Sequence, residues 1–163
     1  MSHTPDSRRS VLYVEDHPVN AMLMSALFDM RPDLRLVIAT TGGEALCLIS
    51  GLCPVLLLLD LRLPDCNGTQ LLALLRLQTG DTPAVAVTAD DDFNIAGTGF
   101  CELWTKPLHM AQVLQRLDAL TSSSPADFGQ GHALPDSDMA LAGAHGFQGM
   151  ASETHQRNIN RSI

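Results

Sequence analysis

Short apolar runs alternate with amphipathic stretches through most of this 163-residue chain. Each run is brief, rich in Val, Leu or Ile and bounded by polar or turn-forming residues, a pattern typical of buried β-strands. The run PVLLLLD is apolar up to its final carboxylate, as expected of a strand in a parallel sheet covered on both faces. The predicted strands cover residues 11–14, 34–39, 54–60, 84–87 and 103–105.

Between these runs, the spacing of apolar residues predicts helices. After Pro18, a favourable first-turn residue, apolar side chains recur at the spacing of a helix that buries one face; they are Val19, Met22, Leu23, Ala26, Leu27 and Met30. Further helices are predicted over 40–50, 71–77, 90–96 (brief) and 110–120. This alternation predicts a doubly wound α/β fold with a five-stranded parallel sheet. Any ligand site should then lie outside the carboxyl ends of the strands.

Composition divides the chain into three zones. Residues 1–10 form a polar lead and residues 11–120 a single domain, of ordinary domain size. Residues 121–163 open with TSSSP, continue rich in Gly and Ala, and are expected to form a flexible or partly ordered tail.

Charge and apolar run length narrow the possible partners and location. The formal net charge is −8, which argues against binding to nucleic acid or to an anionic membrane surface. The longest apolar run, 55–59, is far shorter than the ~18 residues of a membrane span, and the stretch after Arg8 and Arg9 is too short for an export signal. The four cysteines follow no ligand or disulfide spacing. We therefore expect a cytoplasmic protein with reduced thiols.

Chemically active side chains follow four of the predicted strands. Glu15 and Asp16 end the first strand, Asp60 the third, Thr88 the fourth, and Lys106, the only lysine of the chain, follows the fifth. Parallel strands bring their carboxyl ends to one edge of the sheet. We therefore expect three carboxylates, a hydroxyl and an ammonium group to lie together.

This set of groups suits phosphoryl chemistry. Clustered carboxylates repel one another, and a hard cation such as Mg²⁺, which takes oxygen ligands, relieves that repulsion. A carboxylate can attack phosphorus and form an acyl phosphate, and a lysine ammonium can pair with the phosphate. The residues therefore indicate a site that accepts a phosphoryl group on an aspartate.

The segments VLYVEDHPVN, LLLLDLRLPDCNG, AVAVTAD and WTKPL resemble, in order, the motifs of the response-regulator receiver domain of two-component signalling. The resemblance covers about residues 10–121 and implies a flavodoxin-like strand order 2-1-3-4-5. It implies that Asp60 is the phosphoacceptor, that Asp60 and Lys106 carry the catalytic roles, and that the donor is a phosphohistidine. The partner would be a sensor histidine kinase or a histidine phosphotransfer protein.

The resemblance also implies the rest of the site. Mg²⁺ would be bound by Glu15, Asp16, Asp60 and the backbone carbonyl of Arg62, with Asp16 a direct ligand. Thr88 would be the switch hydroxyl that binds the phosphoryl group together with Lys106. Beyond its own phosphotransfer and slow autodephosphorylation, such a domain is not an enzyme.

Two features depart from the family pattern. Leu103 stands where an aromatic switch residue is usual, with Trp104 next to it. The segment from Thr88 to Lys106 is about four residues short, roughly one helical turn, so we expect a shortened fourth helix. The family builds its output face from helix four, strand five and helix five, so we expect this face to depart from the family pattern.

Arg62 and Asp90 flank the expected mouth of the site, two residues after Asp60 and Thr88. We predict that they form a gate that slows entry of the hydrolytic water.

Other functions weighed against this interpretation were a phosphorylation-independent interaction module, a haloacid-dehalogenase-type phosphatase and a flavodoxin. The interaction module stays open as the alternative. The phosphatase needs a second aspartate where Arg62 stands, and the flavodoxin needs a hydroxyl- and glycine-rich loop where the chain has EDHP.

Overall fold

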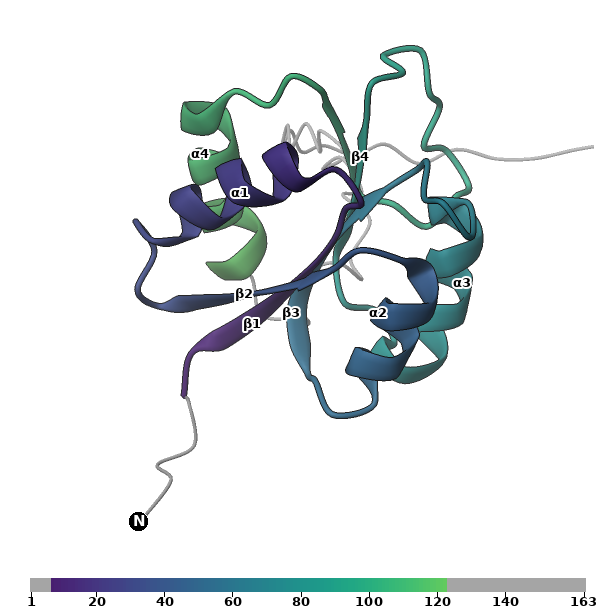
Figure 1. Ribbon diagram of the computed structural model, residues 1–163, viewed down its shortest axis with the longest axis horizontal. Helices are drawn as coiled ribbons and strands as arrows, with labels where there is room; N and C mark the ends of the chain where they lie inside the picture. Colours follow the sequence, from purple (N-terminus) through teal and green to yellow (C-terminus); the bar gives the residue numbers. More distant parts are fainter. Residues whose placement is uncertain (1–6, 123–163) are drawn as a thin grey trace, which may run out of the picture. The chain divides into compact units, whose positions relative to one another are not determined.

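The computed structural model describes residues 7–122 of the chain (Figure 1). Its strands are β1 (Arg9–Val14), β2 (Leu34–Ala39), β3 (Pro54–Asp60), β4 (Ala84–Thr88) and β5 (Glu102–Thr105). Its helices are α1 (Pro18–Phe28), α2 (Gly42–Ile49), α3 (Gly68–Thr79) and α4 (Met110–Ser122).

The five strands form one sheet in the order β2-β1-β3-β4-β5, with every neighbouring pair parallel. Helices α1 and α4 cover one face of the sheet, and α2 and α3 cover the other (Figure 1). The predicted flavodoxin-like order is confirmed. Because all five strands run the same way, their carboxyl ends meet at a single edge.

Alternation along the strands supplies both cores. In β1, Val11 and Tyr13 point into the core beneath α1 and α4, whereas Leu12 and Val14 point into the core beneath α2 and α3. This is the two-residue period of a strand. All four side chains are fully buried, and burial of each aliphatic one contributes about 1.5–3 kcal/mol.

The short helix predicted over residues 90–96, the fourth of the five predicted helices, does not form, and this prediction was wrong. Residues 90–96 form turns instead of a helix. The side chains of Asp90 and Asn94 accept hydrogen bonds from amides two residues further on, at 3.2 and 2.9 Å, a local bond that competes with helix formation. Gly97 and Gly99 then take positive φ angles of 73° and 88°, which L-residues rarely adopt.

Arg76 of α3 anchors the segment that replaces this helix. Its guanidinium donates to the carbonyls of Gly80, Thr82 and Gly99 over 2.6, 2.9 and 2.8 Å. One side chain therefore ties the end of α3 to the connection between β4 and β5.

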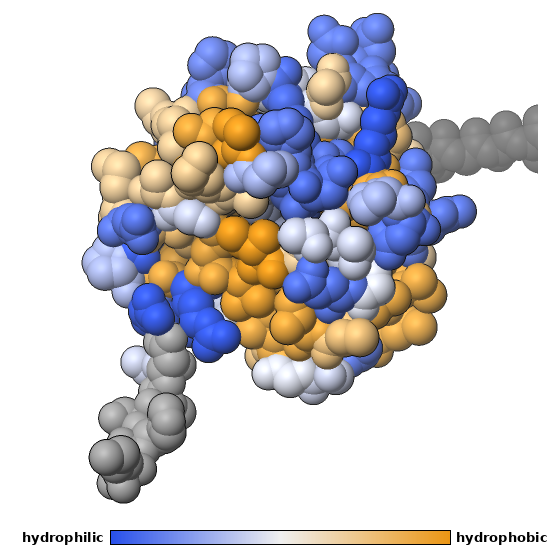
Figure 2. Space-filling model, in the orientation of Figure 1, coloured by the Kyte–Doolittle hydropathy of each residue, from blue (hydrophilic) through white to orange (hydrophobic). Residues whose placement is uncertain are grey.

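The predicted buried face of α1 was also wrong in part. Of the residues expected inside, only Leu27 is buried, and α1 packs instead through Met24, Leu27 and Phe28. The sequence of α1 contains no charged residue, so apolar residues with helical spacing lie on more than one face of this helix. Apolar side chains consequently lie on the surface over α1 (Figure 2). The large exposed ones are Val19, Met22 and Leu23 of α1 and Met30 in the turn after it.

The boundaries of the predicted domain shift slightly. β1 begins at Arg9, and α4 continues to Ser122. The remainder of the predicted lead and tail, residues 1–6 and 123–163, lies outside the described residues. Within residues 7–122, no helix has the length and apolar character needed to cross a bilayer.

Candidate functional site

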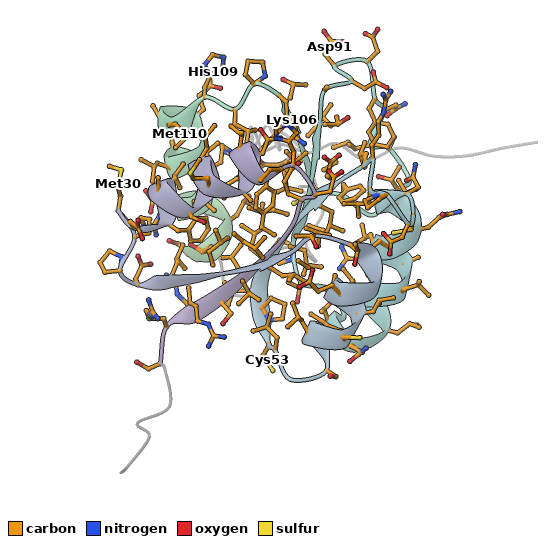
Figure 3. The ribbon with its side chains drawn as sticks, in the orientation of Figure 1. Met30, Cys53, Asp91, Lys106, His109 and Met110 are labelled. Atoms are coloured by element: carbon orange, nitrogen blue, oxygen red, sulfur yellow. The ribbon has the colours of Figure 1, made fainter. Side chains whose placement is uncertain are left out.

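The carboxyl edge of the sheet brings the predicted acids and the lysine together. Oxygen atoms of Glu15, Asp16 and Asp60 all lie within 4.8 Å of one another. Lys106 Nζ lies 2.6 Å from Glu15 Oε2 and 2.5 Å from Asp60 Oδ2. Figure 3 labels Lys106 at this end of the sheet. Thr88 ends β4, the strand paired with β3, and is buried.

Glu15 is a buried carboxylate with a donor on every side. Oε1 accepts from the His17 amide and from Asn20 Nδ2, each over 3.1 Å. Oε2 accepts from the Tyr13 hydroxyl over 2.8 Å and contacts Lys106. Burial by itself raises the pKa of Glu15, but the hydrogen bonds from Lys106, Tyr13 and Asn20 outweigh it and hold the pKa below its ordinary value. Glu15 is therefore a fixed anion of the site.

Lys106 compensates the two buried acids. Burial lowers the pKa of its ammonium group, but hydrogen bonds to Asp60 and Glu15 prevail and raise the pKa above the ordinary value. A cation between two carboxylates makes their burial tolerable, because unpaired buried charges are costly. Lys106 is consequently placed to contact any anionic group that reaches Asp60.

The loop after β3 fixes the other side of Asp60. Asp60 Oδ1 accepts a hydrogen bond from the Arg62 amide over 2.8 Å. The Gly68 amide donates to the Leu61 carbonyl over 3.1 Å. A β-carbon at Gly68 would overlap the Asp60 carbonyl oxygen and lie 2.9 Å from Leu61 Cα. Glycine is therefore required for α3 to begin this close to the end of β3.

Asp16 differs from the other two acids because it is exposed. Four donors already surround Glu15, whereas Asp16 can turn its oxygens toward a bound ion. Three carboxylates at one sheet edge form an all-oxygen donor set of the kind that Mg²⁺ prefers. The residues present therefore fit a magnesium ion.

The two proposed gate residues lie at the surface. Arg62 and Asp90 are both exposed. Among the ion pairs of residues 7–122, none joins Arg62 to Asp90. The Asp90 amide donates to Thr88 Oγ1 over 3.1 Å, so this loop contacts the Thr88 hydroxyl directly. The gate stays a prediction.

The side chain of Trp104, next to Leu103, is buried. It packs into the core beneath α1 and α4, and its indole donates to Glu102 Oε2 over 2.9 Å. Arg116 of α4 pairs with the same glutamate. This aromatic residue therefore ties β5 to α4.

Tyr13 and Asn20 are site residues that the sequence reasoning missed. Tyr13 stands two positions before Glu15, so strand alternation already places both on the same side of β1. Asn20 lies in the first turn of α1, and its contact with Glu15 depends on how the helix packs. The first could have been found by extending the strand pattern; the second required the structure.

The chain matches the family model described as the response regulator receiver domain over residues 11–118. It is 30% identical over 149 residues to protein-glutamate methylesterase/protein-glutamine glutaminase 1 of Myxococcus xanthus, covering 82% of this chain and 42% of that protein. The chain spans about half the length of the curated relatives it matches.

Solved receiver domains share the fold. The non-phosphorylated HemR receiver domain from Leptospira biflexa is 28% identical with a TM-score of 0.65, covering 72% of this chain and 97% of that chain. The receiver domain of sensor histidine kinase PA1611 from Pseudomonas aeruginosa, with a magnesium ion in its active-site cleft, is 24% identical with a TM-score of 0.64. The two coverages are 71% of this chain and 99% of that chain.

Proposed function

Because this chain belongs to the response regulator receiver domain family of two-component signalling, we propose that it accepts a phosphoryl group on Asp60 from a phosphohistidine. The donor would be a sensor histidine kinase or a histidine phosphotransfer protein. The observation that carries the proposal is the setting of Asp60. Its Oδ1 accepts from the Arg62 amide, and its Oδ2 pairs with Lys106 beside two further acids.

In the proposed transfer, a carboxylate oxygen of Asp60 attacks the phosphorus. The donor imidazole is protonated on its other ring nitrogen. The new O–P bond forms as the P–N bond breaks, the electron pair of that bond returns to the ring nitrogen, and a neutral imidazole leaves. The product is an aspartyl phosphate. Lys106 would pair with a phosphoryl oxygen as the negative charge moves from the carboxylate to the phosphoryl group. The Thr88 hydroxyl, which accepts from the Asp90 amide, keeps its own proton for a phosphoryl oxygen.

Glu15, Asp16, Asp60 and the Arg62 carbonyl would hold Mg²⁺. When bound, the ion would neutralise negative charge on the phosphoryl group and on the acids around it. Glu15 already receives four donors and would contribute chiefly as a fixed negative charge, while exposed Asp16 would be a direct ligand. The fit of three oxygen donors within 4.8 Å supports this assignment.

The exposed face of α1 supports the proposal that the phosphodonor is a protein, which would approach the carboxyl edge of the sheet. α1 begins two residues after Asp16, and its first turn contacts Glu15 through Asn20. Met22 and Leu23 on its outer side are 66% and 52% exposed. Contiguous exposed apolar surface of this kind commonly marks a protein-binding site. We propose that the phosphodonor protein packs against α1.

We further propose that the domain is not an enzyme beyond its own phosphotransfer and slow autodephosphorylation, and that it works in the cytoplasm without binding nucleic acid or membrane. Cys47, Cys53, Cys66 and Cys101 are free thiols, which suits a reducing compartment. The net charge of −8 disfavours both nucleic acid and anionic lipid.

The test is phosphorylation of the full chain by acetyl phosphate with Mg²⁺, followed by intact mass spectrometry. We expect one added phosphoryl group in the wild type, none after chelation with EDTA and none in Asp60→Asn. Absence of uptake by the folded wild type would favour the phosphorylation-independent interaction module. Normal labelling of Asp60→Asn would place the phosphoryl group elsewhere.

A further inference from the structure

The tip of the loop that follows Asp60 is anchored on another part of the fold. Asp65 Oδ1 accepts from the Gly42 amide and Oδ2 from the Gly43 amide, each over 2.9 Å. Next to it, Cys66 Sγ packs so closely on Gly42 that a β-carbon there would overlap the sulfur. The loop between β3 and α3 is thus fastened to the first turn of α2, the helix packed beside α3 (Figure 1).

This fastening is electrostatically favourable. The Gly42 and Gly43 amides lower the pKa of Asp65 below its ordinary value, so the carboxylate is ionised at neutral pH. A negative charge at the amino end of a helix is stabilised by the helix dipole and by amides that lack a partner within the helix. α2 already has a separate cap, because Thr41 Oγ1 accepts from the Glu44 amide.

The other end of the same loop holds the phosphoacceptor. The loop closes on itself through the hydrogen bond from the Leu63 amide to the Cys66 carbonyl, 3.3 Å long, and through a bridge between Arg62 and Asn67. The amide of Arg62, at the base of this closed loop, donates to Asp60 Oδ1. A shift of the tip would therefore be transmitted to Arg62 and to the carboxylate that it holds.

We propose that Asp65 is a positioning residue for Asp60, which acts by docking the phosphoacceptor loop on the first turn of α2. With the tip docked, the Arg62 amide stays on Asp60 Oδ1, and the Arg62 carbonyl stays where a metal ion would need it. This inference deepens the proposed function and rests on it, because Asp60 is taken as the phosphoacceptor. If Asp65 only capped α2, its loss would change stability but would leave unaffected the bond from the Arg62 amide to Asp60 and the binding of a metal ion.

Two kinds of variant separate these roles. Asp65→Ala removes both acceptors, and Asp65→Asn keeps one. Gly42→Ala forces the Cys66 sulfur away from α2 and leaves every charge in place. Asp81→Ala, an exposed aspartate before β4, is the matched control.

Three measurements on the full chain report on the loop. The first is hydrogen exchange at the Arg62 amide by NMR, the second is Mg²⁺ affinity of the unphosphorylated protein by calorimetry, and the third is the phosphorylation rate with acetyl phosphate. In Asp65→Ala we expect faster Arg62 exchange and Mg²⁺ binding weakened about tenfold, the lower end of what loss of a ligand's supporting hydrogen bond costs. Asp65→Asn should be intermediate, and Gly42→Ala should change in the same direction.

The outcomes are distinct. Unchanged Arg62 exchange and Mg²⁺ affinity in both Asp65→Ala and Gly42→Ala would overturn the proposal and leave Asp65 as a cap, even if the melting temperature falls. Should Asp65→Ala fail to fold, Asp65→Asn and Gly42→Ala decide by the same measurements. If the wild type takes up no phosphoryl group, the proposed function fails, while exchange at Arg62 still tests the positioning.

Discussion

The hydroxyl of Tyr13 donates a 2.8 Å hydrogen bond to Oε2 of Glu15 within the buried end of β1. The burial of Tyr13 and the nearby negative charge of Glu15 raise the pKa of the phenol, so the hydroxyl keeps its proton. At neutral pH the neutral Tyr13 hydroxyl therefore donates to the ionised Glu15 carboxylate beside it.

Tyr13→Phe should destabilise the fold without changing its shape. The substitution deletes one donor to an ionised, buried carboxylate, and hydrogen bonds to charged groups contribute about 1.5–3 kcal/mol. Urea unfolding of the two proteins at neutral pH measures the difference. In the double variant with Glu15→Gln, the cost of Tyr13→Phe should shrink. A cost that is unchanged would show that the hydroxyl does not act through Glu15.

Glu102 should contribute to the pH dependence of stability. Burial raises its pKa, but hydrogen bonds from Arg116 and Trp104 outweigh burial and lower the pKa below the ordinary value. A group with a depressed folded-state pKa contributes stability that is present above its unfolded pKa and is lost as the pH falls through its folded pKa. The free energy of unfolding, measured with urea from pH 7 down through the range in which carboxyl groups titrate, should fall less steeply with decreasing pH in Glu102→Gln than in the wild type. Identical slopes for the variant and the wild type would contradict the assignment.

Leu23→Glu should slow transfer from a phosphohistidine protein and leave acetyl phosphate uptake unchanged. The expected slowing is about tenfold, the effect of ~1.4 kcal/mol on a barrier, because a charge would be buried where the donor protein packs. Leu77→Glu is the matched control, since Leu77 is 83% exposed on α3 at the other face of the sheet. Equal slowing by both variants, or by neither, would exclude α1 as the donor surface.

Arg62→Ala should speed the loss of phosphate from the proposed aspartyl phosphate without slowing its formation. The backbone amide and carbonyl of residue 62 remain, so only the exposed side chain at the mouth is removed. Lowering the hydrolytic barrier by ~1.4 kcal/mol would speed decay tenfold, and a severalfold change suffices to detect the gate. Decay is followed by mass spectrometry after removal of acetyl phosphate, with Asp90→Asn expected to act likewise. An unchanged decay rate in Arg62→Ala would show that there is no gate.

Much of the proposed site could be predicted because it depends on strand ends. A parallel sheet places the carboxyl end of every strand at one edge, so recognising where β1, β3 and β5 end was enough to bring Glu15, Asp60 and Lys106 together. The contacts of Lys106 with both acids agree with that expectation. The roles of Arg62 and Asp90 as a gate concern a phosphorylated state and stay predictions.

The amino-acid sequence by itself determined the order of strands and helices and the acids and lysine at the sheet edge, because two-residue and 3.6-residue periodicities are local properties. Only the tertiary structure decided which side of the uncharged helix α1 is buried, since several faces are apolar and the choice depends on what packs against them. It also decided that residues 90–96 form turns. There, the hydrogen bonds of the Asp90 and Asn94 side chains, together with the bond from Arg76 to the Gly99 carbonyl, compete with a helix. Contacts such as Asp65 with Gly42 depend on a loop and a helix end, distant in sequence, meeting in space, and no local pattern carries that information.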